Sequence, residues 1–255
     1  MNRLKQSVPD WCFLKDPSAV KEHYQRLKAI GFQGVEMVES ERWPVARAAG
    51  LEILSMPAAA MKEGLNHGAN HAELLPVIAG QIETAADNGI PHVILLSGNR
   101  AGQDEETGFA NCVDAIRKLS PRAEARGVTL VFEMLNVHNH PDYQADNSRF
   151  GFELLEAVDS PALKVLYDVY HMHRMGENVA EDIIGHLNQV AHLHVAGSPN
   201  RDLPGPDQEI DYATLVRDVH AAGYKGYWGQ EWICSDGDRY AALDEARALL
   251  ESYAE

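Results

Sequence analysis

The chain has 255 residues, 45% of them hydrophobic and 24% charged, which is the composition of a globular protein large enough to bury a sizeable core. Its formal net charge is −16 and no cluster of Lys and Arg is present, so the surface repels phosphate backbones and a nucleic-acid partner is not expected. A small neutral or weakly anionic substrate remains compatible with this charge, because the potential at one site can differ from that of the whole surface.

The cysteines and the first residues of the chain indicate the cellular compartment in which the protein is expected. Cys12, Cys112 and Cys234 are scattered without CxxC spacing, which argues against a disulfide framework and fits a reducing environment. The opening residues MNRLKQSVPDW lack the apolar stretch of a signal peptide, and no run approaches the roughly 18 apolar residues of a membrane span. We therefore expect a cytoplasmic protein with no membrane partner, and the sequence leaves open whether it forms a homo-oligomer.

Strand patterns alternate with helix patterns along the whole chain. The predicted strands cover residues 3–8, 34–40, 52–57, 92–98, 129–135, 164–169, 190–197 and 226–232. The helices that follow them in turn cover residues 16–31, 42–50, 71–89, 109–127, 149–159, 179–188, 211–223 and 240–254. Several of these helices end in Gly, the usual C-terminal cap, and Asp16 before Pro17 predicts an N-cap.

These eight strand–helix units run without a linker or a break in composition. They predict an α/β fold, a (β/α)8 TIM barrel that forms a single domain over residues 1–255. An open doubly wound sheet is the alternative, and it is weakened because no GxGxxG follows the first strand. In a barrel of this kind the active site lies at the C-terminal ends of the strands, so polar residues there are the first candidates for function.

The last four predicted strands each end in a residue that can bind a metal. These residues are Glu133, Asp168, His194 and Glu231. Because side chains alternate between the two faces of a strand, apolar neighbours such as Phe132 can pack on the helices while the polar residues point into the barrel. Three carboxylates that converge in one pocket repel one another, and a divalent cation removes that cost. Carboxylate oxygens with one imidazole suit Mn²⁺ or Mg²⁺, and they admit Co²⁺ or Zn²⁺.

Three further residues are candidates for binding substrate. His171 follows Asp168 by three residues and is expected near the mouth of the pocket, where it either bonds a substrate oxygen or caps the loop. Arg201 lies in the loop after the seventh strand and either holds an oxyanion or a substrate carboxylate or is simply solvated. Glu36 ends the second strand and either binds a hydroxyl group or is solvated.

The other histidines near these strands carry weaker signals. His192 points to the same face as His194 but one layer deeper in the barrel, where a structural or supporting role is expected. His138, His140 and His173 are interpreted as loop residues.

Four segments carry a resemblance to a known family: FEMLN, DVYHMH, HLHVAGSPNRDLP with EIDY, and GYWGQEW. They resemble the xylose isomerase-like barrel superfamily, and within it the hydroxypyruvate isomerase family most closely, with the ketose 3-epimerases nearby. The resemblance covers nearly the whole chain. It implies a metal bound by Glu133, Asp168, His194 and Glu231.

The same resemblance implies that Glu133 and Glu231 double as the acid/base pair, and that His171 and Arg201 contact substrate. Two positions depart from the pattern. Hydroxypyruvate isomerases tend to have Gln where His194 stands, and the 3-epimerases carry a Glu at the position of Asn139. Neither substrate class is therefore implied outright.

These residues predict a divalent-metal-dependent isomerase or epimerase of a small sugar, keto-sugar or hydroxy-keto acid. A metal that chelates a carbonyl oxygen and a neighbouring hydroxyl polarises the carbonyl, and one glutamate removes the α proton to give a metal-stabilised enediolate. Returning the proton to the adjacent carbon isomerises the substrate, whereas returning it to the opposite face epimerises it.

Three other functions stay open. A lyase or dehydratase acting on a keto-sugar, or an enzyme that cleaves C-glycosides, would share the enediolate and expel a β-leaving group. An endonuclease-IV-like phosphodiesterase would need several zinc ions, more His ligands and a basic groove, which the net charge disfavours. A non-catalytic sugar-binding subunit is disfavoured because both glutamates of the acid/base pair are retained.

Overall fold

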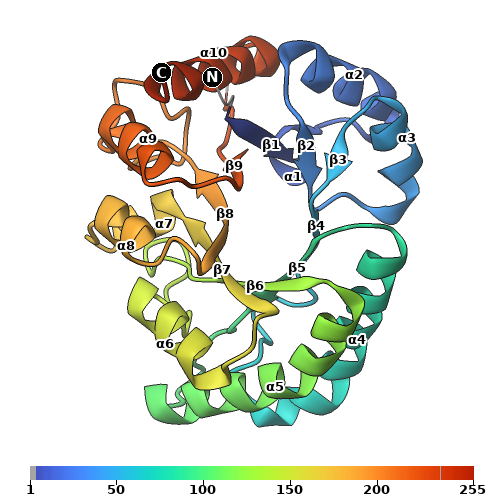
Figure 1. The fold of residues 1–255 in the computed structure, drawn as a ribbon, viewed down its shortest axis with the longest axis vertical. Helices are drawn as coiled ribbons and strands as arrows, with labels where there is room; N and C mark the ends of the chain where they lie inside the picture. Colours follow the sequence, from blue (N-terminus) through green and yellow to red (C-terminus); the bar gives the residue numbers. More distant parts are fainter. Residues whose placement is uncertain (1–3, 236) are drawn as a thin grey trace.

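The computed structural model describes residues 4–235 and 237–255, and within them nine parallel strands form a nearly closed barrel inside a ring of helices (Figure 1). The strands are β1 (Lys5–Pro9), β2 (Gly34–Glu36), β3 (Glu52–Ile53), β4 (Ser55–Met56), β5 (His92–Leu96), β6 (Thr129–Glu133), β7 (Leu163–Asp168), β8 (Val190–Val195) and β9 (Tyr227–Gln230). Strand β9 pairs with β1, so the two ends of the chain meet in the sheet. The first predicted strand begins at Arg3, which lies outside the described residues.

The sheet begins at β3 and ends at β4, two strands that follow each other directly along the chain. Between them, Leu54 donates its backbone N–H to the carbonyl oxygen of Val35 at 2.9 Å and accepts from the N–H of His92 at 3.1 Å. Strands β3 and β4 therefore occupy one barrel position, kinked at Leu54. This arrangement confirms the predicted single-domain TIM barrel of eight strand positions.

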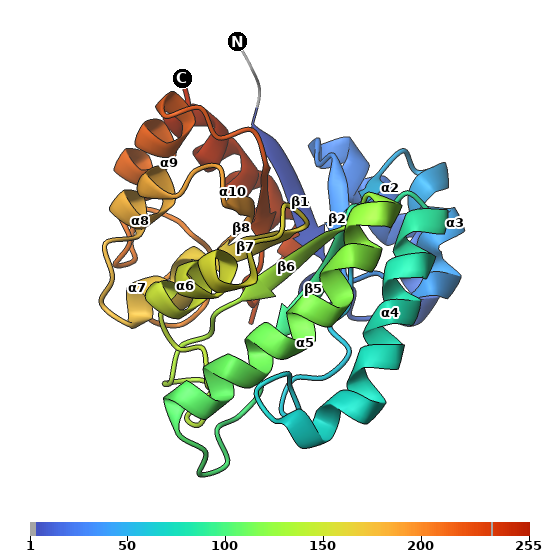
Figure 2. The ribbon, with the colours of Figure 1, turned by 60° about the horizontal axis from the view of Figure 1, so that its bottom comes forward.

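The helices cover the outside of the barrel, and Figure 2 shows α4 and α5 lying side by side along it. The helices are α1 (Asp10–Phe13), α2 (Val20–Ile30), α3 (Trp43–Ala48), α4 (His71–Asp87), α5 (Glu105–Arg126), α6 (Ser148–Val158), α7 (Val169–Arg174), α8 (Val179–Gly185), α9 (Tyr212–Ala221) and α10 (Arg239–Tyr253). Two short helices, α1 and α7, were not predicted, and each begins directly after the C-terminal end of a strand. Among the described residues no helix is both long and apolar enough to cross a membrane.

Two predicted helix caps are confirmed, whereas α5 begins four residues before its predicted start and α8 ends three residues before its predicted end. The Asp16 side chain accepts a hydrogen bond from the N–H of Ser18 at 2.8 Å, with Pro17 at the first position of the turn. At the C-terminus of α2, Gly31 has φ 113°, a left-handed conformation that glycine adopts without steric cost.

The interior of the barrel holds a polar layer. Barrel interiors are commonly filled by branched apolar side chains. Here Ser7, Glu36, His192 and His194 lie inside the barrel, each at most 1% exposed. Buried polar groups are costly unless they are hydrogen-bonded, so this layer requires a specific arrangement of partners.

Candidate active site

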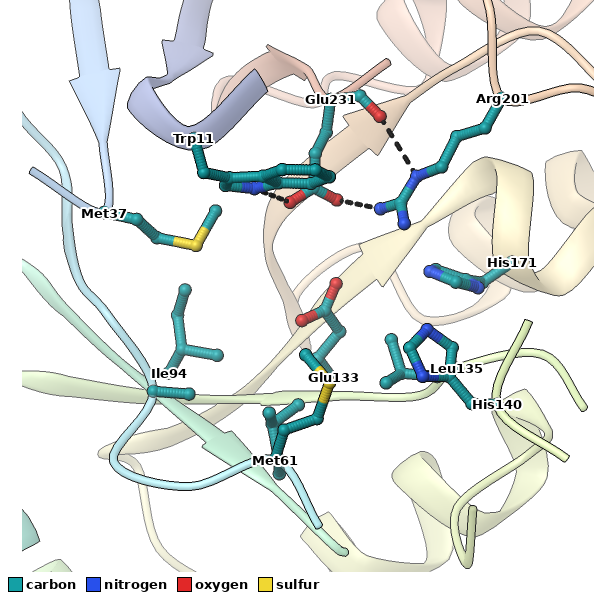
Figure 3. A pocket seen from close by; sticks show the side chains of 12 residues that line it. Trp11, Met37, Met61, Ile94, Glu133, Leu135, His140, His171, Arg201 and Glu231 are labelled. Carbon is teal, nitrogen blue, oxygen red and sulfur yellow. Dashed lines mark hydrogen bonds and ion pairs between the residues drawn. The ribbon is translucent and has the colours of Figure 1, made fainter. Parts of the chain in front are cut away.

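A pocket of about 360 Å³ opens at the C-terminal ends of the strands (Figure 3). Its lining combines polar and apolar side chains from most strand positions: Trp11, Met37, Ala58, Met61, Ile94, Leu96, Glu133, Leu135, His140, His171, Arg201 and Glu231. Figure 3 shows Glu133 and Glu231 on opposite sides of the pocket, with Arg201 and His171 on one flank and Met37 on the other.

The four predicted metal ligands converge at the base of this pocket. Glu133 ends β6, Asp168 ends β7, His194 lies near the end of β8, and Glu231 follows β9 directly. One ligand atom from each residue lies within 4.8 Å of the others, and all four residues are buried. The alternation of side chains along the strands thus brings together the residues that the sequence placed at four strand ends.

The two carboxylate oxygens of Asp168 make different contacts. Its Oδ1 accepts a hydrogen bond from the backbone N–H of His171 at 3.0 Å, which caps the N-terminus of α7. Its Oδ2 is buried without a hydrogen-bond partner and faces the Arg201 guanidinium at 3.5 Å. A carboxylate oxygen left in this way is costly unless a cation occupies the space before it.

His194 lies between two groups of carboxylates. Its Nε2 is 2.9 Å from the Glu36 carboxylate, deeper in the barrel. Its Nδ1 faces the pocket, 3.0 Å from Glu231 and 3.5 Å from Glu133. No hydrogen-bond partner is assigned to Nδ1, although the atom is buried.

The surroundings shift the pKa values of the three carboxyl groups of this cluster in different directions. Burial, opposed by the Arg201 charge, raises the pKa of Asp168 to about 7. Burial also raises the pKa of Glu133. Burial opposes ionisation of Glu231 as well, but the charges of His194 and Arg201 outweigh it and hold the pKa of this carboxyl below its usual range. The site therefore carries more acidic groups than Arg201 and His194 neutralise easily.

These residues fit a divalent cation. Oxygen ligands bind such ions at about 2.0–2.6 Å, so ligands of one ion lie no more than about 5 Å apart, and the ligand atoms of this cluster all lie within that limit. Two of the buried atoms that lack a hydrogen-bond partner, Asp168 Oδ2 and His194 Nδ1, belong to it. Three carboxylates with one imidazole form a donor set suited to Mn²⁺ or Mg²⁺.

Arg201 lies in the pocket and is not simply solvated, since its side chain is only 17% exposed. Its Nη2 donates to Glu231 Oε2 at 2.6 Å, and its guanidinium lies 5.4 Å from the ring centre of Trp11 and 5.6 Å from that of Tyr170. The indole N–H of Trp11 donates to the other oxygen of Glu231 at 3.0 Å. Both oxygens of Glu231 are thus held in place.

His171 presents one ring nitrogen to the pocket side. Its Nδ1 accepts a hydrogen bond from the backbone N–H of Asn136 at 3.0 Å. Burial and the Arg201 charge lower the pKa of His171 well below its usual range, so the ring is neutral and its proton is assigned to Nε2. This Nε2–H has no hydrogen-bond partner and lies 3.7 Å from Asp168 Oδ2. His171 is therefore a hydrogen-bond donor and not a base.

Other residues lie where the sequence did not place them. Trp11 and His140 line the pocket, although α1 was not predicted and His140 was interpreted as a plain loop residue. His173 belongs to α7 and not to a loop. Glu36 is 0% exposed and lies beneath His194, away from the pocket lining. The depth of Glu36 in the barrel depends on the register between neighbouring strands, and the residue pattern of a single strand does not predict that register.

Comparison with known proteins agrees with the fold. Residues 24–253 match the model of the xylose isomerase-like TIM barrel, and the chain belongs to that family.

Two curated relatives share part of the chain. The hydroxypyruvate isomerase of Escherichia coli K12 is 28% identical over 156 residues, which cover 61% of this chain and 60% of that protein. The 2-oxo-tetronate isomerase of Cupriavidus necator is 30% identical over 162 residues, covering 63% of this chain and 62% of that one. The matched part thus spans less than two thirds of the length of either relative.

A solved structure shares the fold of this chain along the whole length of the chain. The structure of an L-ribulose 3-epimerase superposes with a TM-score of 0.84 at 19% identity, covering 100% of this chain and 95% of that chain.

Proposed function

We propose that this protein is an isomerase or epimerase of a small carbonyl compound that carries a hydroxyl group next to the carbonyl. The observation that carries the proposal is the placement of Glu133 and Glu231 on opposite sides of one buried pocket (Figure 3). A carboxylate on each side of a substrate can remove a proton from one carbon and return one to the neighbouring carbon or to the opposite face. The names of the two relatives, both isomerases of hydroxy-keto acids, support this reading.

A divalent cation would be held by Glu133, Asp168, His194 and Glu231. When bound there, it would act as a Lewis acid that polarises the substrate carbonyl and makes the neighbouring C–H group acidic. Mn²⁺ and Mg²⁺ are the ions that this donor set suits best.

The chain's own side chains divide the remaining tasks. Glu133 and Glu231 take and return the proton, and the hydrogen bonds from Trp11 and Arg201 keep Glu231 ionised and oriented. The Nε2–H of His171 donates to a substrate oxygen. Arg201 adds positive charge beside the oxygen that becomes negative in the transition state.

The lining also limits the size of the substrate. Apart from these polar groups the lining is largely apolar, formed by Met37, Ala58, Met61, Ile94, Leu96 and Leu135. A substrate with hydroxyl groups along its whole length would leave the outer ones unpaired against this wall, which is costly. We therefore propose a hydroxy-keto acid or keto-sugar of three or four carbons in preference to a hexose.

The proposal is tested by offering the Mn²⁺-loaded protein hydroxypyruvate, a 2-oxo-tetronate, a ketopentose and a ketohexose in D₂O, and following products by NMR. We expect product and deuterium at the carbon next to the carbonyl, with the highest kcat/KM for the three- or four-carbon acids. Preference for the hexose would refute the size limit alone. Absence of product and of exchange with every compound would refute the isomerase or epimerase assignment.

A further inference from the structure

The polar layer inside the barrel is centred on Glu36 of β2. The side chain of Glu36 is completely buried, and three groups from two other strands surround its carboxylate. Oε1 accepts a hydrogen bond from the Ser7 hydroxyl at 2.6 Å. Oε2 lies 2.9 Å from the Nε2 atoms of both His192 and His194. Neither a substrate group nor solvent reaches this carboxylate.

Strand β9 provides the space for this cluster. A Cβ atom at Gly229 would lie 2.5 Å from Glu36 Oε1 and 2.7 Å from the His194 ring, distances that real Cβ atoms essentially never show. A larger residue here would displace Glu36 or the His194 ring. The absence of a side chain at Gly229 is thus what allows Glu36 to reach His194.

The contacts of His194 indicate which of its ring nitrogens can bind a metal. An imidazole has two nitrogens, and the hydrogen bond made by one determines which nitrogen is free to bind a metal. Nε2 is directed at a carboxylate, which only accepts hydrogen bonds, so Nε2 must carry a proton. The nitrogen left for a cation is therefore Nδ1, the atom that faces Glu231 and Glu133, and a cation bound there would displace the proton that Nδ1 can carry toward Glu231 when no metal is present.

We propose that Glu36 is a positioning residue: it holds the Nε2–H of His194 and thereby turns the Nδ1 lone pair toward the metal. This inference rests on the metal site of the proposed function. This positioning role replaces substrate binding, which was the role expected for Glu36 from its place at a strand end. Partners of this kind commonly set the orientation and basicity of metal-bound histidines, and their loss typically weakens metal binding about 10–100-fold.

A second cation held by Glu36, His192 and His194 is the competing explanation, since their ligand atoms also cluster. The 2.9 Å separation between Glu36 Oε2 and His194 Nε2 is that of an N–H···O hydrogen bond, whereas His192 Nε2, at the same distance, makes no hydrogen bond. Ligands around one cation at about 2.0–2.1 Å each would lie about 3 Å or more apart and would have no protons between them. Metal stoichiometry therefore separates the two explanations.

The first experiment needs no substitution. Protein labelled with ¹⁵N-histidine is loaded with Zn²⁺, a diamagnetic probe ion, and the ring nitrogens are observed by two-dimensional NMR. We expect about one Zn²⁺ per chain, with His194 protonated at Nε2 and bound through Nδ1. A His194 that is protonated at Nδ1, two ions per chain, or no binding of Zn²⁺ would each overturn the inference.

The second experiment measures affinity for Mn²⁺ by calorimetry in Glu36→Gln and Ser7→Ala. Glu36→Gln keeps the size but loses the charge and one acceptor, so we expect affinity to fall about 10–100-fold. Ser7→Ala leaves the carboxylate in place, and we expect a smaller loss in the same direction. Glu52→Gln, on the neighbouring strand and outside the cluster, is the matched control and should bind as the wild type does.

Circular dichroism and thermal unfolding without metal would establish that each variant is folded. Unchanged Mn²⁺ affinity in folded Glu36→Gln would overturn the inference. If Glu36→Gln does not fold, Ser7→Ala and the wild-type NMR spectrum decide the question. Because these readouts do not depend on turnover, a protein that binds metal as described but converts no substrate would refute the proposed function and leave this inference standing.

Discussion

Asp168 accepts a hydrogen bond from the backbone N–H of His171 through one carboxylate oxygen, and its other oxygen lies buried at the metal cluster without a hydrogen-bond partner. One side chain thus fixes the start of α7 and offers a ligand. The same contact fixes the first turn of α7, which carries His171, so the proposed substrate donor is positioned by a proposed metal ligand. Because the two roles use different oxygens of Asp168, substitution can separate them.

Asp168→Asn should lose metal affinity while it keeps the helix cap, because an amide oxygen can still accept from the N–H of His171. Asp168→Ala should lose both, and its free energy of unfolding without metal should lie about 0.5–2 kcal/mol below that of Asp168→Asn, the usual effect of losing a cap. Metal titration and denaturant unfolding of the two variants measure these effects. Full metal occupancy in Asp168→Ala would contradict its assignment as a ligand.

Removing the metal should abolish turnover and lower stability. In the absence of a cation, the carboxylates of Glu133, Asp168 and Glu231 remain close together in a buried site. A ligand that binds only the folded state adds about 2.7 kcal/mol at one hundred times its Kd. Dialysis against EDTA should therefore lower Tm, and added Mn²⁺ should restore both Tm and activity. A chelated protein with unchanged Tm and activity would argue against a bound cation.

His171→Ala should keep the metal but lose catalytic efficiency. A substrate oxygen left without its buried donor costs about 1–3 kcal/mol, so kcat/KM should fall about 10- to 100-fold. Mn²⁺ titration and steady-state kinetics with the best substrate separate the two effects. Metal loss as large as that in Asp168→Ala would show that His171 is itself a ligand.

His23, which is not part of the pocket lining, should make stability depend on pH. Burial, together with the Arg239 and Arg42 charges, lowers the pKa of His23 from 6.5 to about 4. Between these values the unfolded chain binds more protons than the folded one, so the free energy of unfolding falls as pH drops from about 6.5 to about 4. The effect is on the order of 3 kcal/mol at most. Urea unfolding across this range should show it.

His23→Phe should flatten this part of the stability profile, whereas His138→Phe at an exposed position should leave it unchanged. An equally steep loss of stability in His23→Phe would show that another group binds the protons.

Much of the fold could be predicted because its signals are local. The alternation of strand and helix patterns identified the eight strand positions and all the described α-helices except α1 and α7, and side-chain alternation placed Glu133 on the inner face of its strand. The four strand-end residues then met because parallel strands in a barrel end on the same side.

What the sequence missed depends on features that are not periodic. Trp11 reaches the pocket through α1, a helix too short to show a pattern, and His140 through a loop whose path is set by its hydrogen bonds. The depth of Glu36 follows from the register between strands, which pairs it with Pro9 on β1 and places its carboxylate beneath the His194 ring. Strand alternation predicts the face on which a residue lies, but not the layer.

The proton transfer assigned to Glu133 and Glu231 is tested most directly by the kcat of Glu133→Gln and Glu231→Gln at saturating Mn²⁺, with metal occupancy measured in the same samples. Glutamine keeps the size and an oxygen ligand but cannot accept the proton. Each variant should lose about 10²–10⁴-fold in kcat, the usual contribution of a general base, while its fold and metal content persist. Near-normal turnover by both variants at full metal occupancy would contradict the mechanism.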